Sequence, residues 1–241
     1  MTKTLDCPRH AGWHGIRPTR RYLPSVIRLA GWIALLSSFP VHAAEPASVT
    51  FSLDFPDSDP EHYSISVRSD GHARYECSAR ISADSDDRET YQTEFTSADS
   101  TRTRIFELAE QARYFSEKLD SGNKRVAFTG AKKLAYKDGQ REFTAEYNIS
   151  KLAAVQQLTS LFQNIAATLE YGRRLAHEHR YQKLALDDEL KRMEEQARRG
   201  DLSELQAVKP VLQEIYDDSS VINVVRARAQ RIMEMGTRAG R

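Results

Sequence analysis

Apolar residues alternate with polar ones through much of the first half of this chain, whereas beyond Ser150 they recur every three or four positions. A period of two is typical of strands with one buried face, and a spacing near 3.5 is typical of amphipathic helices. Short turns join the alternating segments, which favours an antiparallel sheet over a doubly wound nucleotide-binding fold. We therefore predict an α+β protein, with a sheet domain at residues 44–149 and a helical region at residues 150–241.

The predicted sheet domain consists of short alternating segments separated by turn signals. Pro56 ends the first segment, and Asp138-Gly139 is a two-residue hairpin signal of the kind that joins antiparallel strands. The segments lie at residues 49–55, 63–67, 73–81, 91–95, 126–128, 134–136 and 143–147. Such an arrangement predicts one polar face and one face that a helix must cover.

A single covering helix is predicted between the fourth and fifth of these segments. Ser97 or Asp99 can cap its start. Its apolar residues form one stripe suited to lie across the sheet, namely Ile105, Leu108, Ala109, Ala112 and Phe115. We expect this stripe to pack against the sheet residues Phe51, Leu53, Tyr75 or Phe143.

The helical region opens with a long heptad pattern over residues 155–197, and Ser150 is predicted to cap it. An unbroken helix of this length would reach ~70 Å at 1.5 Å per residue, well beyond the size of a small domain. Either the helix breaks near residues 179–188, where Asp187 or Asp188 could cap a new one, or its distal half projects and packs against the C-terminal helices.

Two shorter helices are predicted to complete the chain as a hairpin. Gly200 stops the long pattern, and Asp201 and Glu204 have the spacing of a capping box. The first helix of the hairpin spans residues 202–215, and the second starts at residue 218 or 219.

The apolar seam of the long helix bears on the oligomeric state. Its first half should be buried within the domain in every case, through Leu158, Phe162, Ile165 and Leu169. Its second half, formed by Leu186, Leu190 and Met193, is covered either by the returning hairpin or by a second copy of the chain. The short connection at Gly200 favours antiparallel neighbours. We favour a monomer, with self-association or a protein partner on the long helix as the alternative.

The first 43 residues have the order of a secretory signal peptide. Arginines precede a short apolar run at residues 29–39, and Val41-His42-Ala43 places small residues at the positions that a signal peptidase reads. The apolar run is much shorter than the ~20 residues of a spanning helix, so we predict cleavage without a stable membrane anchor. The predicted location is the periplasm or the medium outside the cell.

Charge and cysteine content narrow the function further. The chain has 35 basic and 34 acidic residues, and the leader contains six of the basic ones and one of the acidic ones. Cleavage would leave a mildly acidic protein of net charge −4 with interspersed charges, which argues against nucleic-acid binding. Cys77 would remain as the single cysteine, and its place in an alternating segment predicts a buried, unreactive thiol.

No motif specifies a metal, a cofactor or a nucleophile. His177 and His179 are two residues apart and point in different directions on a helix, unlike zinc ligands spaced by four. The acidic loop at residues 57–61 lacks the glycine and the distal glutamate of an EF-hand, so we interpret it as a solvated turn. The chain contains no Gly-x-Ser-x-Gly and no glycine-rich phosphate loop. We predict neither a metal nor a cofactor.

A polar cluster on the long helix is the candidate binding surface. Arg173, His177 and Tyr181 lie four residues apart on one helical face, and Arg174 can pair with Glu170 one turn away. Such a surface could bind an acidic ligand or a carboxylate of a partner protein through charge-assisted hydrogen bonds. The plainer interpretation, which we favour, is an exposed helix whose charges pair along its surface.

Three segments resemble a group of predicted secreted bacterial proteins of unknown function. They are residues 51–56 (FSLDFP), 158–163 (LTSLFQ) and 181–185 (YQKLA). The resemblance spans most of the exported chain, and it implies export but no particular activity.

We therefore predict an exported, non-enzymatic binding or assembly protein of the bacterial envelope. The alternative is a secreted hydrolase whose site forms only in three dimensions. Its general bases would be the four histidines outside the leader, which are His62, His72, His177 and His179. An enzyme should show a concave pocket in which one of these histidines faces a carboxylate or a hydroxyl group.

Overall fold

The structure, a computed structural model, describes residues 45–56, 58–80, 87–123 and 125–239. The predicted signal peptide and its cleavage site lie outside these residues. In the part of the chain that is described, no helix combines the length and the apolar character needed to cross a membrane.

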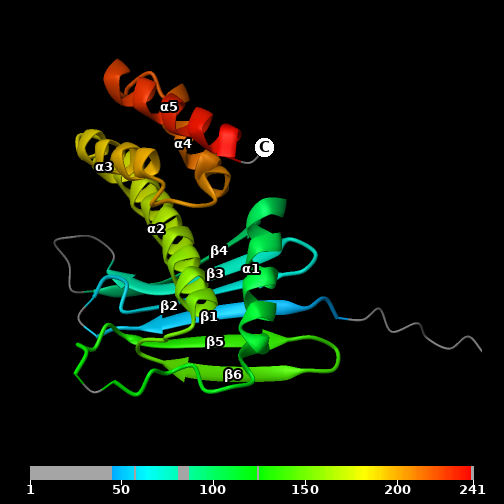
Figure 1. Cartoon of the computed structure of the whole chain (residues 1–241). Helices are drawn as coiled ribbons and strands as arrows, with labels where there is room; N and C mark the ends of the chain where they lie inside the picture. The colour runs from blue at the N-terminus through cyan, green and yellow to red at the C-terminus, as the bar shows by residue number, and fades with distance from the viewer. Residues whose placement is uncertain (1–44, 57, 81–86, 124, 240–241) are drawn as a thin grey trace, which may run out of the picture. The chain divides into compact units, whose positions relative to one another are not determined.

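Six strands form one antiparallel sheet in the order β4-β3-β2-β1-β5-β6 (Figure 1). They are β1 (Ser48–Asp54), β2 (His62–Arg68), β3 (His72–Arg80), β4 (Arg88–Thr96), β5 (Ala131–Lys137) and β6 (Glu142–Tyr147). At its centre, Phe51 lies opposite Ile65 and Leu134, and all three are fully buried. The neighbouring Thr50 and Ser52 are only partly buried, as a period of two requires. The predicted antiparallel sheet is confirmed.

One predicted alternating segment, residues 126–128, is not a strand. The neighbouring strand β5 begins only after Gly130, whose φ of 96° is left-handed. Phe128 instead lies on the surface, with its ring edge-on to that of Phe55 at 6.0 Å. Three residues of alternation are a weak signal for a strand, and the left-handed glycine separates them from the strand that comes next.

Helices α1 (Asp99–Gln111) and α2 (Ala153–Tyr181) lie on the same face of the sheet (Figure 1). The predicted stripe is buried in one core with the sheet, since Ile105, Leu108 and Phe115 are at most 1% exposed and share this core with Phe51, Leu53 and Tyr75. The helix itself is shorter than predicted, because α1 ends at Gln111 and Phe115 belongs to a 3₁₀ turn, η1 (Arg113–Phe115). Phe143 is only partly buried, so it does not belong to this core. The ring of Phe162 on α2 stacks on Phe51 at 5.4 Å. The predicted covering helix therefore shares its face with the start of the long helix.

The start of α1 differs from the prediction. Its N-cap residue is Ala98, and neither Ser97 nor Asp99 provides a side-chain cap. The backbone N–H of Ala98 donates instead to both carboxylate oxygens of Glu204, at 3.2 and 3.0 Å, and the Ser97 hydroxyl donates to the same carboxylate at 3.3 Å. An anion is stabilised at this position because the N-terminus of a helix carries partial positive charge.

Replacing Leu108 with alanine should lower the free energy of unfolding by about 2–5 kcal/mol. The side chain is 1% exposed beneath the sheet, so truncation removes buried apolar surface and leaves a cavity. Urea unfolding measures the effect, and Glu107→Ala, on the exposed side of the same helix, is the control. A Leu108→Ala variant with the wild-type midpoint would contradict the packing of α1 on the core.

The long heptad pattern folds as two helices, α2 and α3 (Leu186–Arg199), which confirms the break. The apolar seam is weakest there, and the connection is fastened through Lys183, whose ammonium donates to Asp218 and Ser220 at 2.6 Å each. The expected capping side chains are not used, because the N-cap residues are Leu152 and Ala185. Gly200 closes α3 with a φ of 82°, as predicted.

The predicted C-terminal hairpin consists of α4 (Lys209–Asp217) and α5 (Asn223–Ala239). A 3₁₀ turn, η2 (Leu205–Val208), lies between α3 and α4. The predicted capping box does not form, because Glu204 has a left-handed backbone (φ 63°) and its carboxylate binds the start of α1. Helix α5 also begins later than predicted, since Asp218 accepts hydrogen bonds from Ser220 in a turn.

The returning hairpin covers the distal seam. Leu186, Leu190 and Met193 are fully buried, and α5 packs along α3 with Val225, Ala229 and Ile232 in the same core. The proximal seam is buried as predicted, through Leu158, Phe162, Ile165 and Leu169. The fold-back that we favoured is thus the observed arrangement within one chain.

Candidate functional site

A buried carboxylate lies where α2 crosses the sheet. Glu170 is 4% exposed, and it accepts hydrogen bonds from the Tyr75 hydroxyl at 2.7 Å and from the Cys77 thiol at 3.2 Å, both on β3. Its second oxygen accepts from Nε of Arg173 at 3.0 Å, and Nη1 of Arg173 donates to the carbonyl oxygen of Arg80 at 3.0 Å. The helix is thereby fastened to the end of β3 by a charged network with full hydrogen bonding.

This environment fixes the protonation of its members. Burial first, and the Glu170 charge second, raise the pKa of the Cys77 thiol to about 12 and that of Tyr75 far above its ordinary value. Burial alone would lower the pKa of Arg173, but the Glu170 carboxylate outweighs it and holds that pKa above the usual range. The thiol is therefore neutral at ordinary pH, and a buried, unreactive Cys77 fits the prediction.

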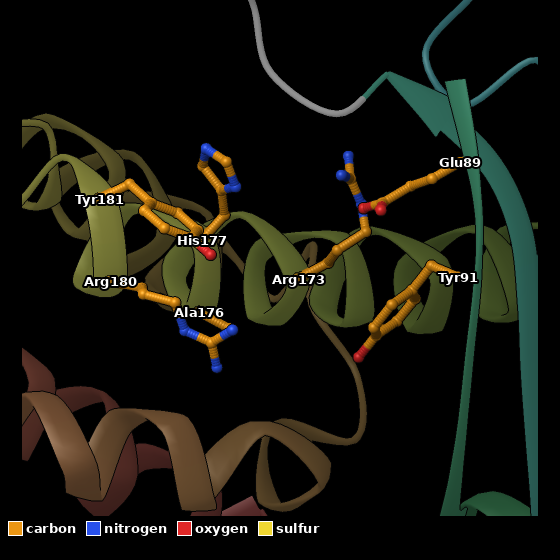
Figure 2. A pocket seen from close by; sticks show the side chains of 7 residues that line it. All are labelled: Glu89, Tyr91, Arg173, Ala176, His177, Arg180 and Tyr181. Atoms are coloured by element: carbon orange, nitrogen blue, oxygen red, sulfur yellow. The ribbon is translucent and has the colours of Figure 1, made fainter. Parts of the chain in front are cut away.

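A pocket of about 530 Å³ lies beside this network (Figure 2). Two of its lining residues, Glu89 and Tyr91, belong to β4, and the other five lie along the distal half of α2. The lining consists of Glu89, Tyr91, Arg173, Ala176, His177, Arg180 and Tyr181. The pocket thus occupies the angle between the first residues of β4 and the part of α2 that extends past them.

Three of the four predicted binding residues meet at this pocket, namely Arg173, His177 and Tyr181. Arg174 does not, because one residue along a helix is a rotation of about 100°. Its Nε donates to Glu189 of α3 at 2.6 Å, and its guanidinium lies over the ring of Tyr171. The predicted pair of Arg174 with Glu170 is only a 4.0 Å contact, whereas Arg173 bonds to Glu170 directly.

The pocket contains two charges of opposite sign that lack ion pairs. Among the described residues, Glu89 has no basic partner, and Arg180 has no acidic one; the Arg180 guanidinium lies only over the ring of Tyr181, at 5.8 Å. Arg173, by contrast, already forms an ion pair with Glu170. The ring of His177 lies 5.0 Å from that of Tyr181. The pocket can therefore offer a free guanidinium, a free carboxylate and aromatic surface.

Arg180 was not among the predicted binding residues, and nothing in the sequence indicated that Glu89 and Tyr91 would line a site. Both lie in β4, more than eighty residues before the residues of α2 that complete the pocket. Tyr91 was part of the fourth alternating segment, which says nothing about what faces it, and Glu89 lay outside every predicted segment.

Three of the four candidate general bases of the alternative hydrolase lie beside a carboxylate, and the fourth, His177, lines the pocket. His62 bonds to Asp54 at 2.5 Å, and His72 lies 3.5 Å from Glu94. Both pairs lie on the exposed face of the sheet. His177 lines the pocket, and its described contact there is aromatic. His179 bonds through Nε2 to Asp218 at 2.9 Å. In the described part of the chain, no group of three or more histidine, cysteine, aspartate or glutamate side chains could hold a metal ion.

On the other side of α2, Glu178 faces α3. Its Oε2 atom is buried and has no hydrogen-bond partner among the described residues. Burial first, and the charge of Glu189 second, raise the pKa of Glu178 to about 7, although Arg174 and Arg192 act in the opposite direction. Glu178, at the junction of α2 and α3, should therefore titrate near neutral pH.

The variant Glu178→Gln should remove part of the pH dependence of stability. A glutamate ionises at about pH 4.3 in an unfolded chain, so between that pH and about 7 the folded protein binds the extra proton. Stability from this group is thus present at low pH and is lost as pH rises through 7. Urea midpoints from pH 4 to 8 should fall less in the variant than in wild type, and at pH 8 the variant should be the more stable.

Glu195→Gln, at an exposed position on α3, is the control for this pH series. Parallel pH profiles for wild type and Glu178→Gln would show that the carboxyl group titrates in the same way in the folded and unfolded chains.

Comparison with known proteins adds no assignment. No protein-family model matches the chain, and a search of the curated proteins finds no match either.

Proposed function

We propose that this chain is an exported, non-enzymatic binding protein of the bacterial envelope, and that its ligand site is the pocket between β4 and α2. The observation that carries the proposal is the unpaired guanidinium of Arg180 in a pocket with aromatic walls. A free guanidinium binds a carboxylate by charge-assisted hydrogen bonds. The ligand would thus present a carboxylate to Arg180, with the rings of Tyr91 and Tyr181 in contact with its apolar part.

The rigid wall of this pocket favours binding over catalysis. Arg173 is held by Glu170 and by the Arg80 carbonyl, so it forms a fixed surface and is not free to move protons. A general base would need a hydrogen-bonded orienting partner, and His177 has only the Tyr181 ring as its described contact. The side chains present can attract and orient an acid, which is the role of a binding site.

Titration with succinate tests the pocket. In the exported protein labelled with ¹⁵N, the amide signals of Tyr91, His177 and Arg180 should shift in a saturable way. Arg180→Gln should weaken binding at least about tenfold, because a hydrogen bond to a charged group contributes about 1.5–3 kcal/mol. Arg199→Gln, an exposed arginine on α3, is the matched control. Shifts that do not saturate, or that are equal in both variants, would refute the site.

Export itself is inferred from the leader and from the resemblance to predicted secreted bacterial proteins. We propose cleavage after Ala43, which places the protein in the periplasm or outside the cell. N-terminal sequencing of the protein recovered from the periplasmic fraction should begin at Ala44. A terminus at Met1, or recovery only from the cytoplasm, would overturn this part of the proposal.

One polar cluster bears on the alternative of a secreted hydrolase. The Ser220 hydroxyl accepts from the Lys183 ammonium at 2.6 Å and donates to Asp218 at 2.7 Å, and Asp218 also binds His179. The carboxylate lies between the imidazole and the hydroxyl, which is the wrong order for a triad, where the histidine stands in the middle. We therefore expect no labelling of Ser220 by a fluorophosphonate; labelling that Ser220→Ala abolishes would favour the hydrolase.

A further inference from the structure

Strand β4 forms one edge of the sheet. It pairs with β3 over its whole length, from Arg88 opposite Arg80 to Thr96 opposite His72, and no strand in the described part of the chain pairs with its other side. Edge strands are commonly protected by proline, by bulges, by shortness or by charged side chains. Strand β4 carries the charged residues Arg88, Glu89 and Glu94, but it has nine residues, contains no proline, and keeps a continuous register with β3. Its outer backbone groups can therefore accept another strand.

The pocket opens beside this edge. Glu89 and Tyr91 are two residues apart on β4, so they share the face of the sheet on which α2 lies. A strand added to β4 would run about 4.8 Å away, with alternate side chains on that same face. Those side chains would point toward Arg180, Tyr181 and the carboxylate of Glu89, which Figure 2 shows on the two walls of the pocket.

The charges of the two walls indicate which peptide fits. Arg180 on α2 and Glu89 on β4 are both unpaired among the described residues, and they have opposite signs. A complementary strand would present an acidic residue to Arg180 and a basic residue to Glu89. Both must lie on one face of the peptide strand, and the shortest spacing that places them there has one residue between them.

We propose that the partner of this pocket is an extended peptide segment, with an acidic and a basic residue at positions i and i+2, that adds to β4 as a seventh strand. This inference rests on the proposed function, since it identifies the carboxylate that Arg180 binds. Main-chain hydrogen bonds to the edge would supply affinity, and the pocket would select the side chains, as in other cases of strand addition.

The test uses nine-residue peptides of alternating valine and threonine that carry a Lys-x-Glu or a Glu-x-Lys pair, so that both strand directions are sampled. The control peptides have the same composition with the two charges adjacent, which places them on opposite faces of a strand. One of the paired series should bind at least tenfold more tightly than the control. Arg180→Gln should remove this preference, whereas Arg199→Gln should retain it.

Backbone measurements distinguish strand addition from simple binding of a carboxylate. Methylation of single peptide amides should weaken binding at every second position only, because successive amides of a strand face opposite sides. Hydrogen exchange in β4 should slow at alternate residues when the peptide is bound. Binding without either alternation would refute strand addition.

The remaining outcomes separate the two proposals. If succinate binds at the pocket and no peptide does, the peptide inference is wrong and the acid-binding site stands. If neither binds, both are wrong. If alternate β4 amides are already protected in a dimer without peptide, the edge pairs with a second copy of this chain, and the peptide inference is again overturned.

Discussion

Replacing Glu170 with alanine is expected to destabilise the protein by about 3–5 kcal/mol, because it leaves a buried guanidinium without its counter-charge. Arg173 is 6% exposed and cannot turn toward water without leaving the Arg80 carbonyl. The Tyr75 hydroxyl and the Cys77 thiol would lose their acceptor at the same time. Urea unfolding at neutral pH measures the loss of stability.

Two comparisons make this prediction specific. Glu146→Ala removes one partner of an exposed pair with Lys133 and should cost no more than about 1 kcal/mol. The double variant Glu170→Leu with Arg173→Met removes both buried charges and should recover much of the loss, since a buried pair can be replaced by apolar residues at little net cost. A Glu170→Ala protein as stable as Glu146→Ala would show that the network contributes nothing.

Leu190→Glu should unfold the helical region and not merely separate two subunits. Leu190 is fully buried between α3 and α5, so the new carboxylate would enter an apolar core without a partner, at a cost of several kcal/mol. Light scattering should find a wild-type monomer, and circular dichroism should show reduced helix content in the variant. Lys191→Glu, at the exposed neighbouring position, should leave both measurements unchanged.

The opposite result would also be clear. A wild-type dimer that Leu190→Glu converts into a folded monomer would mean that this seam joins two copies, and the fold-back would then not be the form in solution.

Local patterns were enough to predict most of the fold. The alternation around Phe51 and Ile65 identifies central strands, because one face of each must be buried. The stripe through Leu108 identifies the covering helix, and the seam through Leu190 identifies a buried face. In each case the signal repeats every few residues and does not depend on distant parts of the chain.

The features that the sequence could not show depend on pairs that are distant along the chain. Glu204 was assigned to a local capping box, yet it caps α1 more than a hundred residues earlier. Glu89 gave no sign of lining a pocket together with Arg180, since only the crossing of α2 over the sheet brings their elements together. Arg173 was predicted to bind a ligand, but its ion pair with Glu170 could be distinguished from other helical pairs only once burial was known.

The Glu204 contact also has a consequence for cooperativity. The residue belongs to the helical region, but the backbone that it stabilises is the first turn of the helix covering the sheet. Melting of the C-terminal helices would therefore withdraw an anion from the start of α1 and loosen the sheet's cover. Heat should then unfold the two regions in a single transition, and a chain shortened to residue 200 would retain its strands yet melt at a lower temperature.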